Sequence, residues 1–406
     1  MSKIASRVQK FAKKDLQDKI TGYQDILQNI ISPPKEEDLI EFFKCIIPTE
    51  APQVSYNLTD TFSNSMALIP DSIQINVGKV VIELIEGKPS SHFDNSEFII
   101  RRIVAEKLEH LKQYGEAAKI LEVSLSKASN HSKKEICILY THYSFCLLMT
   151  PECLNIKSYD PKDLETIPSY VKANDTFALA LSLKDRIDDD VDRIPFMYTD
   201  ALIAEIHKKF ESARQKFYSL SLVPNVPNSE QYLIRTVQNA LLSPPGEARD
   251  KFFATLVADS RTHSLPHYPV LLQFCQHKLI SEAAVKQHSL RSFFLPPQLP
   301  FLDPSLIKSN IVSLSLIYSN ITLLQLTTLL EMEPTTQNIE TVETFAAELI
   351  SSGLIDGSID QIMGVIKFHS QSTILTEWDG QLNNLLISAI DSCDLMDLHG
   401  LLPQKA

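Results

Sequence analysis

The sequence predicts a mainly α-helical protein with one small β element near its C-terminal end. Glycine is scarce, with 10 residues among 406, whereas an average usage of about 7 % would give nearly three times as many. Three of these glycines, Gly353, Gly357 and Gly364, lie close together. Apolar residues recur with the helical period through most of the first 295 positions. Because tight turns and bulges depend on glycine, we expect β structure only around these three residues.

The negative charge of the chain is concentrated at its C-terminal end. The formal net charge is −12, and residues 301–406 hold three lysines against thirteen acidic residues, whereas the first 300 residues are nearly balanced. Nucleic acid or an anionic membrane would be repelled by this end. No apolar run approaches the roughly 18 residues that a membrane span needs, and the six cysteines form no C-x-x-C pair. We expect an intracellular protein with reduced thiols that binds neither nucleic acid nor membrane.

Residues 1–295 should form a right-handed, TPR-like solenoid of helical repeats that begins with an N-terminal arm. One pattern occurs twice: an aromatic residue, an alanine three positions later, and a large residue four positions after the alanine. Its members are Tyr114, Ala117 and Leu121 in the first copy and Phe210, Ala213 and Phe217 in the second. The alanine lets two antiparallel helices approach closely, and such pairs stack into solenoids. Further helices are expected at residues 134–149 and 169–183.

A proline-rich segment, residues 295–304, predicts a boundary loop after the solenoid, because proline interrupts helices. A lead-in helix should follow at residues 304–320. The predicted domains are therefore a helical-repeat domain at 1–295, a winged-helix module at 296–374 and a C-terminal bundling helix at 375–406.

The order of elements in residues 320–368 is that of a winged helix, two short helices followed by a β-hairpin. Thr322 and Gln325 have the spacing of a capping box, which predicts a helix start. A second apolar stripe covers residues 338–352, and Gly353 follows it as a helix C′ residue does. Two strands, residues 358–362 and 365–368, should flank a two-residue loop at Met363 and Gly364.

The second helix of this module has the wrong charge for reading DNA. Residues 338–352 contain no lysine or arginine but include Glu340, Glu343 and Glu348. A helix that faces phosphates needs positive charge. A nucleic-acid-binding winged helix is therefore only a remote alternative, and the module is expected to bind protein.

The hairpin edge and the C-terminal helix are the predicted partner-binding surfaces. We expect the edge Val365–Phe368 to pair with the sheet of a neighbouring protein. The helix after Trp378 has an apolar stripe that is broader than its own domain needs. The candidate partner-binding residues are Val365, Ile366, Phe368, Trp378, Leu382, Leu386, Ile390 and Cys393. Packing within the domain is the simpler alternative for Ile366 and Phe368, and for Trp378 the two alternatives are evenly balanced.

No catalytic or metal-binding motif is complete in the sequence. His263 and His267 have helical metal spacing, but Pro266 lies between them and a third ligand is lacking. Asp188, Asp190 and Asp192 imitate the start of an EF-hand loop that lacks the required glycine and glutamate. Ser124 and Lys127 form an isolated S-x-x-K pair. We therefore predict a protein that is not an enzyme and has no cofactor, no metal and no catalytic residue.

Three C-terminal segments, residues 314–332, 357–368 and 376–386, resemble the PCI domain family and, within it, the fourth-subunit family of the constitutive-photomorphogenesis (COP) signalosome. In that family, residues matching 318–322 enter the first winged helix and residues matching 359–364 form the wing. The pair matching Trp378 and Asp379 opens the last helix. The proline-rich residues 293–301 depart from the family, whose members have a polar loop there. A related subunit of the proteasome lid is the alternative.

The resemblance implies a non-catalytic scaffold. The signalosome removes a ubiquitin-like modifier from cullins with a zinc isopeptidase in another subunit. Implied partners are PCI neighbours at the winged helix, a helical bundle at the C-terminal helix, the isopeptidase-containing pair of subunits, and a cullin-RING ligase at the N-terminal arm. The implied localisation is cytoplasmic and nuclear.

Overall fold

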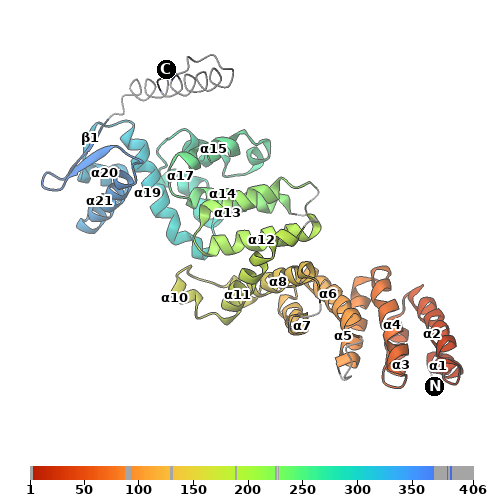
Figure 1. Ribbon diagram of the computed structural model, residues 1–406. Coiled ribbons are helices and arrows are strands. Elements are labelled where there is room, and N and C mark those ends of the chain that lie inside the picture. Colours follow the sequence, from red (N-terminus) through yellow and green to blue (C-terminus); the bar gives the residue numbers. More distant parts are fainter. Residues whose placement is uncertain are drawn as a thin grey trace, which may run out of the picture. The chain divides into compact units, whose positions relative to one another are not determined.

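The computed structural model describes residues 3–86, 93–128, 131–187, 190–224, 226, 228–369, 382 and 385. The chain divides into two compact units, residues 1–232 and 233–406 (Figure 1). The division falls within helix α14 (Ser229–Leu242). The domain boundaries expected after residues 295 and 374 stay predictions. The described chain is mainly helical with one small sheet, as the sequence predicts.

Unit 1 is a succession of helices in which each packs on helices that lie close to it in the sequence, either the next one or one shortly after it (Figure 1). Its α-helices are α1 (Lys3–Phe11), α2 (Leu16–Ile31), α3 (Glu36–Ile46), α4 (Pro52–Ser65), α5 (Asp71–Glu86), α6 (Asp94–His110), α7 (Tyr114–Ser126), α8 (Lys133–Leu148), α9 (Pro151–Leu154), α10 (Pro161–Leu164), α11 (Pro168–Ser182), α12 (Asp190–Ile206) and α13 (Phe210–Ser221). The pairs include α5 with α6, α6 with α7, α8 with α11, and α12 with α13. The predicted helices at residues 134–149 and 169–183 are α8 and α11.

The two copies of the aromatic and alanine pattern occupy equivalent places in two helix pairs. Tyr114 begins α7 and Phe210 begins α13. Two residues before each aromatic residue, Lys112 and Lys208 have left-handed φ values of 60° and 62°. The alanines of both copies, Ala117 and Ala213, are fully buried. The turn and the close approach of the helices are thus built alike in both pairs, as expected for a repeat.

Unit 2 continues with short helices and ends in the winged-helix module. After α14 come α15 (Glu247–Ala258), α16 (Tyr268–Cys275), α17 (Glu282–Gln287), α18 (Leu290–Phe293), α19 (Leu299–Ser315), β1 (Asn320–Thr322), α20 (Leu323–Leu329), α21 (Thr336–Ser351), β2 (Gly357–Asp360) and β3 (Val365–Phe368). Among the described residues, no helix combines the length and apolar character that crossing a bilayer requires.

The prediction of a loop at residues 295–304 is wrong. Pro296 and Pro297 lie in a short 3₁₀-helix, and α19 begins at Leu299. Pro300 lies in the first turn of α19, where a missing backbone N–H costs nothing. Pro304 lies only one turn further on. Pro300 therefore starts the helix and Pro304 lies within it, so no boundary loop separates the solenoid from the module at residues 299–304.

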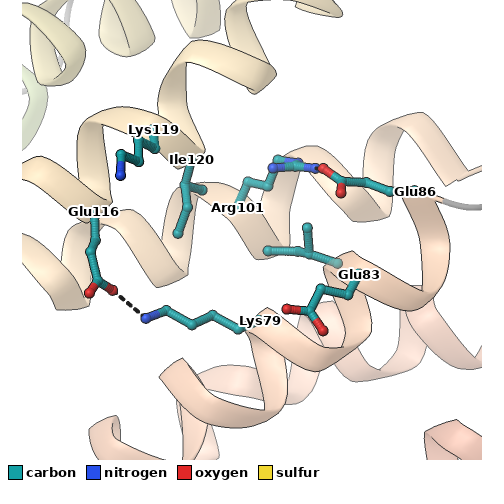
Figure 2. A pocket seen from close by; sticks show the side chains of 8 residues that line it. Lys79, Glu83, Glu86, Arg101, Glu116, Lys119 and Ile120 are labelled. Atoms are coloured by element: carbon teal, nitrogen blue, oxygen red, sulfur yellow. Dashed lines mark hydrogen bonds and ion pairs between the residues drawn. The ribbon is translucent and has the colours of Figure 1, made fainter.

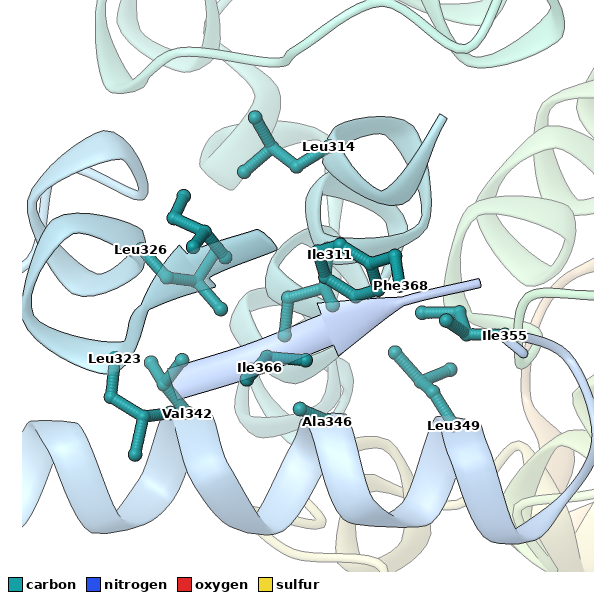
Figure 3. Packing of buried hydrophobic residues seen from close by; sticks show 11 residues of the cluster. Ile311, Leu314, Leu323, Leu326, Val342, Ala346, Leu349, Ile355, Ile366 and Phe368 are labelled. Atoms are coloured by element: carbon teal, nitrogen blue, oxygen red, sulfur yellow. The ribbon is translucent and has the colours of Figure 1, made fainter. Parts of the chain in front are cut away.

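The winged-helix module is a three-stranded antiparallel sheet packed on α19, α20 and α21. The strand order is β1-β3-β2. Figure 3 shows the core between the sheet and the helices. Its fully buried members include Ile311, Leu326, Val342, Ala346 and Ile366. This core holds both edges of the sheet in place.

Local signals in the module are confirmed at its helix ends but not at its turn. The capping box of Thr322 and Gln325 is present, and Gly353 has a φ of 73° at the C′ position, after the C-cap residue Ser352 of α21. The prediction of a two-residue hairpin loop is wrong. Asp360 pairs with Val365, so the loop has four residues, 361–364. Strand β1 was not predicted.

Candidate protein-interaction surface

Strand β3 is the centre of the sheet, not its edge. It pairs with β1 on one side and with β2 on the other. The prediction that Val365–Phe368 is a free edge is therefore wrong, because β1, which the sequence pattern does not reveal, occupies that side. Ile366 is fully buried and Phe368 is 6 % exposed, whereas Val365 is half-buried. Ile366 and Phe368 thus belong to the core, which was the simpler alternative.

The edge of β1 exposes the backbone of one residue. Phe368 N–H donates to Ser319 C=O, and Leu323 N–H donates to Gly364 C=O, both at 2.8 Å. In an antiparallel ladder every second residue faces the partner strand. The backbone groups of Asn320 therefore point away from β3, on a side where no strand pairs within the described chain.

The edge of β2 exposes the backbone of two residues. His369 N–H donates to Asp356 C=O at 2.9 Å, which makes even-numbered residues of this strand face β3. The N–H and C=O groups of Gly357 and Ile359 therefore point outward. As far as the chain is described, no other strand covers them. Unpaired edges of this kind accept a strand from another protein.

Helix α21 presents acidic side chains beside this sheet. Glu340 is exposed. Glu348 pairs with Lys308 at 2.6 Å, and Glu343 accepts a hydrogen bond from Gln361 Nε2 at 2.6 Å. Residues 309–366 contain seven acidic residues and no lysine, arginine or histidine. Such a surface repels phosphates.

The turn between β2 and β3 carries two exposed apolar residues that are not among the predicted partner-binding residues. Ile362 is 97 % exposed and Met363 is 72 % exposed. The sequence pattern predicts Ile362 in a strand and Met363 in a tight loop, and neither position indicates a partner. The signal that could have marked them is the pair of turn-favouring residues around them, Asp360 before and Gly364 after.

The candidates in the C-terminal helix fall almost entirely outside the described residues. Trp378, Leu386, Ile390 and Cys393 are not described. Leu382 is helical and 50 % exposed. Their role in partner binding stays a prediction.

The catalytic and metal candidates do not assemble into sites in the described structure. Among the described residues, no group of three potential ligands comes together. His267 stacks on Phe293 at 3.8 Å between ring centroids, and His263 Nε2 lies 3.0 Å from Val257 C=O. Lys127 pairs with Glu97 at 2.7 Å, while the Ser124 hydroxyl donates to Ile120 C=O.

A largely buried polar cluster, with Cys146 buried and His142 and Glu109 partly buried, joins α6 to α8 in unit 1. His142 Nδ1 lies 3.0 Å from Glu109 Oε1, and the Cys146 thiol donates to the same oxygen at 3.3 Å. Burial alone would lower the pKa of His142, but the Glu109 carboxylate outweighs it and the pKa lies above its usual value. Burial, reinforced by Glu109, raises the pKa of Cys146. This thiol is therefore not a nucleophile at neutral pH.

A shallow groove between α5, α6 and α7 is lined by balanced charges (Figure 2). Its volume is about 390 Å³. Lys79 pairs with Glu116 across it, and the buried Arg101 pairs with Glu86 and, at 2.8 Å, with Glu97. With most of its charges paired and the two signs balanced, the groove has the character of a surface between repeats and not of a reactive site.

Comparisons with known proteins agree with this architecture. Residues 272–370 match the model of the PCI domain. The chain is similar over nearly its whole length to proteins named COP9 signalosome complex subunit 4. The protein from Emericella nidulans is 25 % identical over 394 residues, covering 91 % of each chain. That from Arabidopsis thaliana is 24 % identical over 412 residues, covering 95 % of this chain and 96 % of the relative. That from Dictyostelium discoideum is 24 % identical over 385 residues, covering 93 % and 92 %.

These similarities confirm the resemblance that three C-terminal segments indicated. They extend it from the last quarter of the sequence to the helical repeats. They also agree with the prediction that the chain is not an enzyme.

Proposed function

We propose that this chain is a non-catalytic scaffold subunit of the COP9 signalosome. The observation that carries the proposal is the similarity to subunit 4 proteins over more than 90 % of this chain. A local match to the PCI domain alone would fit several assemblies. A match through both units favours one assembly and one position within it.

The proposed activity of the complex is removal of a ubiquitin-like modifier from cullins by an isopeptidase in another subunit. That isopeptidase is a zinc enzyme whose metal site needs a His-x-His pair, and the 11 histidines of this chain include none. The part of this chain would be to hold neighbours in place and to sense substrate. We place it in the cytoplasm and the nucleus, where the complex would meet cullin ligases.

Three regions would share the contacts of the scaffold. The unpaired edge of β2, with Gly357 and Ile359 pointing outward, suits pairing with the sheet of a PCI neighbour. The apolar stripe of residues 375–406 suits a helical bundle. The N-terminal arm, helices α1 to α5, would contact a cullin-RING ligase, and the isopeptidase-containing pair of subunits would complete the set of partners.

Purification of the tagged full-length chain from its own cells tests the proposal, with partners identified by mass. Signalosome subunits are the expected partners. Recovery of proteasome-lid subunits instead would overturn it in favour of the lid.

Deletion of residues 376–406 should leave a folded protein that no longer co-purifies with the complex. A gel-shift titration at low salt should show no retardation of DNA, because phosphate contacts are strongest there.

A further inference from the structure

The tip of the wing, residues 361–364, is the most conspicuous apolar protrusion on the described surface. Ile362 is 97 % exposed, which is more than any other large hydrophobic residue that the structure describes. Met363 beside it is 72 % exposed. The turn projects from the sheet at the margin of unit 2 (Figure 1). Adjacent exposed apolar side chains on one protrusion are typical of a binding anchor.

The backbone of the wing tip is held in one conformation. Asp360 Oδ1 accepts hydrogen bonds from Ile362 N–H at 3.1 Å and from Met363 N–H at 3.0 Å. Gly364 closes the turn with a φ of 62°, and its C=O accepts from Leu323 N–H at 2.8 Å. A turn fixed in this way loses little conformational entropy when its side chains become buried by a partner.

The surroundings of the wing tip limit the kind of partner. Asp360 lies at its base, and Gln361 binds Glu343 of α21. The whole stretch of residues 309–366 has seven acidic residues and no basic one. Charge complementarity therefore favours a surface that carries lysine or arginine around an apolar pocket. Anionic lipid and nucleic acid are negatively charged, as this module is, and would be repelled by it.

We propose that the wing tip is a docking anchor whose Ile362 and Met363 side chains enter an apolar pocket, bordered by lysine or arginine, on a neighbouring subunit. The proposal rests on the proposed function for the identity of the complex. It differs from strand pairing at β2, which uses backbone groups and is indifferent to the side chains at the tip. The anchor supplies side-chain specificity to an edge that by itself has little.

The first experiment compares assembly of the full-length double variant Ile362→Ser/Met363→Ser with the wild type, using purified signalosome subunits from the same organism. Both side chains are exposed, so folding should be unchanged. Loss of an interface anchor of this kind should weaken binding by about 30-fold or more. Leu68→Ser is the matched control, because Leu68 is 75 % exposed on unit 1, and it should assemble as the wild type does.

The outcomes separate the anchor from the wider proposal. If the wild type assembles and the double variant binds within about twofold of it, the anchor is refuted and the scaffold role stands. If the wild type assembles with no signalosome subunit, both are refuted. Asp360→Ala, which frees the turn, should weaken binding less than the double variant, while Asp360→Asn keeps the acceptor and should bind nearly as the wild type does.

A second experiment identifies the pocket. A photo-crosslinking amino acid at position 362 of the assembled full-length chain should give one dominant crosslink, to apolar residues of another subunit flanked by lysine or arginine. Crosslinks to residues 370–406 of the same chain would show that the chain covers its own wing tip. That result, or an acidic site of crosslinking, or no crosslink at all, would overturn the proposal.

Discussion

The side-chain amide of Asn310 forms both hydrogen bonds that a strand partner would form with Ile280. Its Oδ1 accepts from the Ile280 N–H and its Nδ2 donates to the Ile280 C=O, each at 2.9 Å. Both residues are buried. On the same segment, Glu331 accepts from the Glu282 N–H at 2.6 Å. The chain that enters α17 is thereby fastened to α19 and to the end of α20.

Replacing Asn310 by alanine should destabilise unit 2. The change leaves a buried N–H and a buried C=O of Ile280 without partners, and each costs about 1–3 kcal/mol. We expect a loss of about 2–4 kcal/mol in urea denaturation and faster hydrogen exchange at the Ile280 N–H. Asn29→Ala is the control, because Asn29 is exposed and bonds only within α2. Equal effects of the two substitutions would contradict the fastening role.

The edge of β2 can be tested by one pair of substitutions. Ile359→Ala removes a half-buried side chain but keeps the N–H that points outward, whereas Ile359→Pro removes the N–H as well. Proline is tolerated at an edge where its N–H is not bonded within the sheet. If a neighbour pairs with this edge, Ile359→Pro should weaken assembly about tenfold beyond Ile359→Ala. The reason is that a backbone carbonyl of the neighbouring strand would be buried without the N–H that donates to it. Equal binding by the two variants would rule out strand pairing there.

The contact between His142 and Glu109 should make unit 1 pH-dependent. The pKa of folded His142 lies above that of the unfolded chain, which is about 6.5. The stabilisation is therefore fully present below that value and is lost as pH rises through the folded pKa. The midpoint of thermal unfolding should fall as the pH rises through the window that begins at about 6.5 and extends through the folded pKa. In Glu109→Gln this fall should be much smaller. A wild type whose midpoint rises with pH in this window would refute the assignment.

The buried alanines of the helix pairs should not accept larger residues. Ala117 and Ala213 are fully buried, and added methylene groups in a packed core typically cost about 1–3 kcal/mol. Ala117→Leu and Ala213→Leu should each lower the thermal midpoint of unit 1. Ala347→Leu, at an exposed position of α21, is the matched control and should leave stability nearly unchanged. A neutral Ala213→Leu would show that the helices of that pair are not in close contact.

The sequence was most informative where one residue type meets one local requirement. The alanines at 117 and 213 mark close helix contacts. Thr322 with Gln325 marks a helix start, and Gly353 marks a helix end. These signals depend on neighbours within a few positions, so they survive without knowledge of the tertiary structure.

The errors concern contacts between distant segments. Strand β1 has three residues, and its strand character comes from pairing with β3, more than forty positions later in the chain. Without β1, the central strand β3 looks like a free edge, and Ile366 and Phe368 become candidates for partner binding although packing in the core is the simpler alternative for both. Pro300 predicts a helix break by propensity, although its place in a first turn is compatible with a helix. Position within an element, which propensity does not reveal, decided both cases.

The uninterrupted negative charge of residues 309–366 also bears on what the free chain avoids. Two copies of this module could in principle join through their unpaired sheet edges, as exposed strands commonly do. Like charges on both copies oppose that encounter, more strongly at low ionic strength. The acidity that favours a basic neighbour in the proposed docking therefore also opposes pairing between two free copies of this chain.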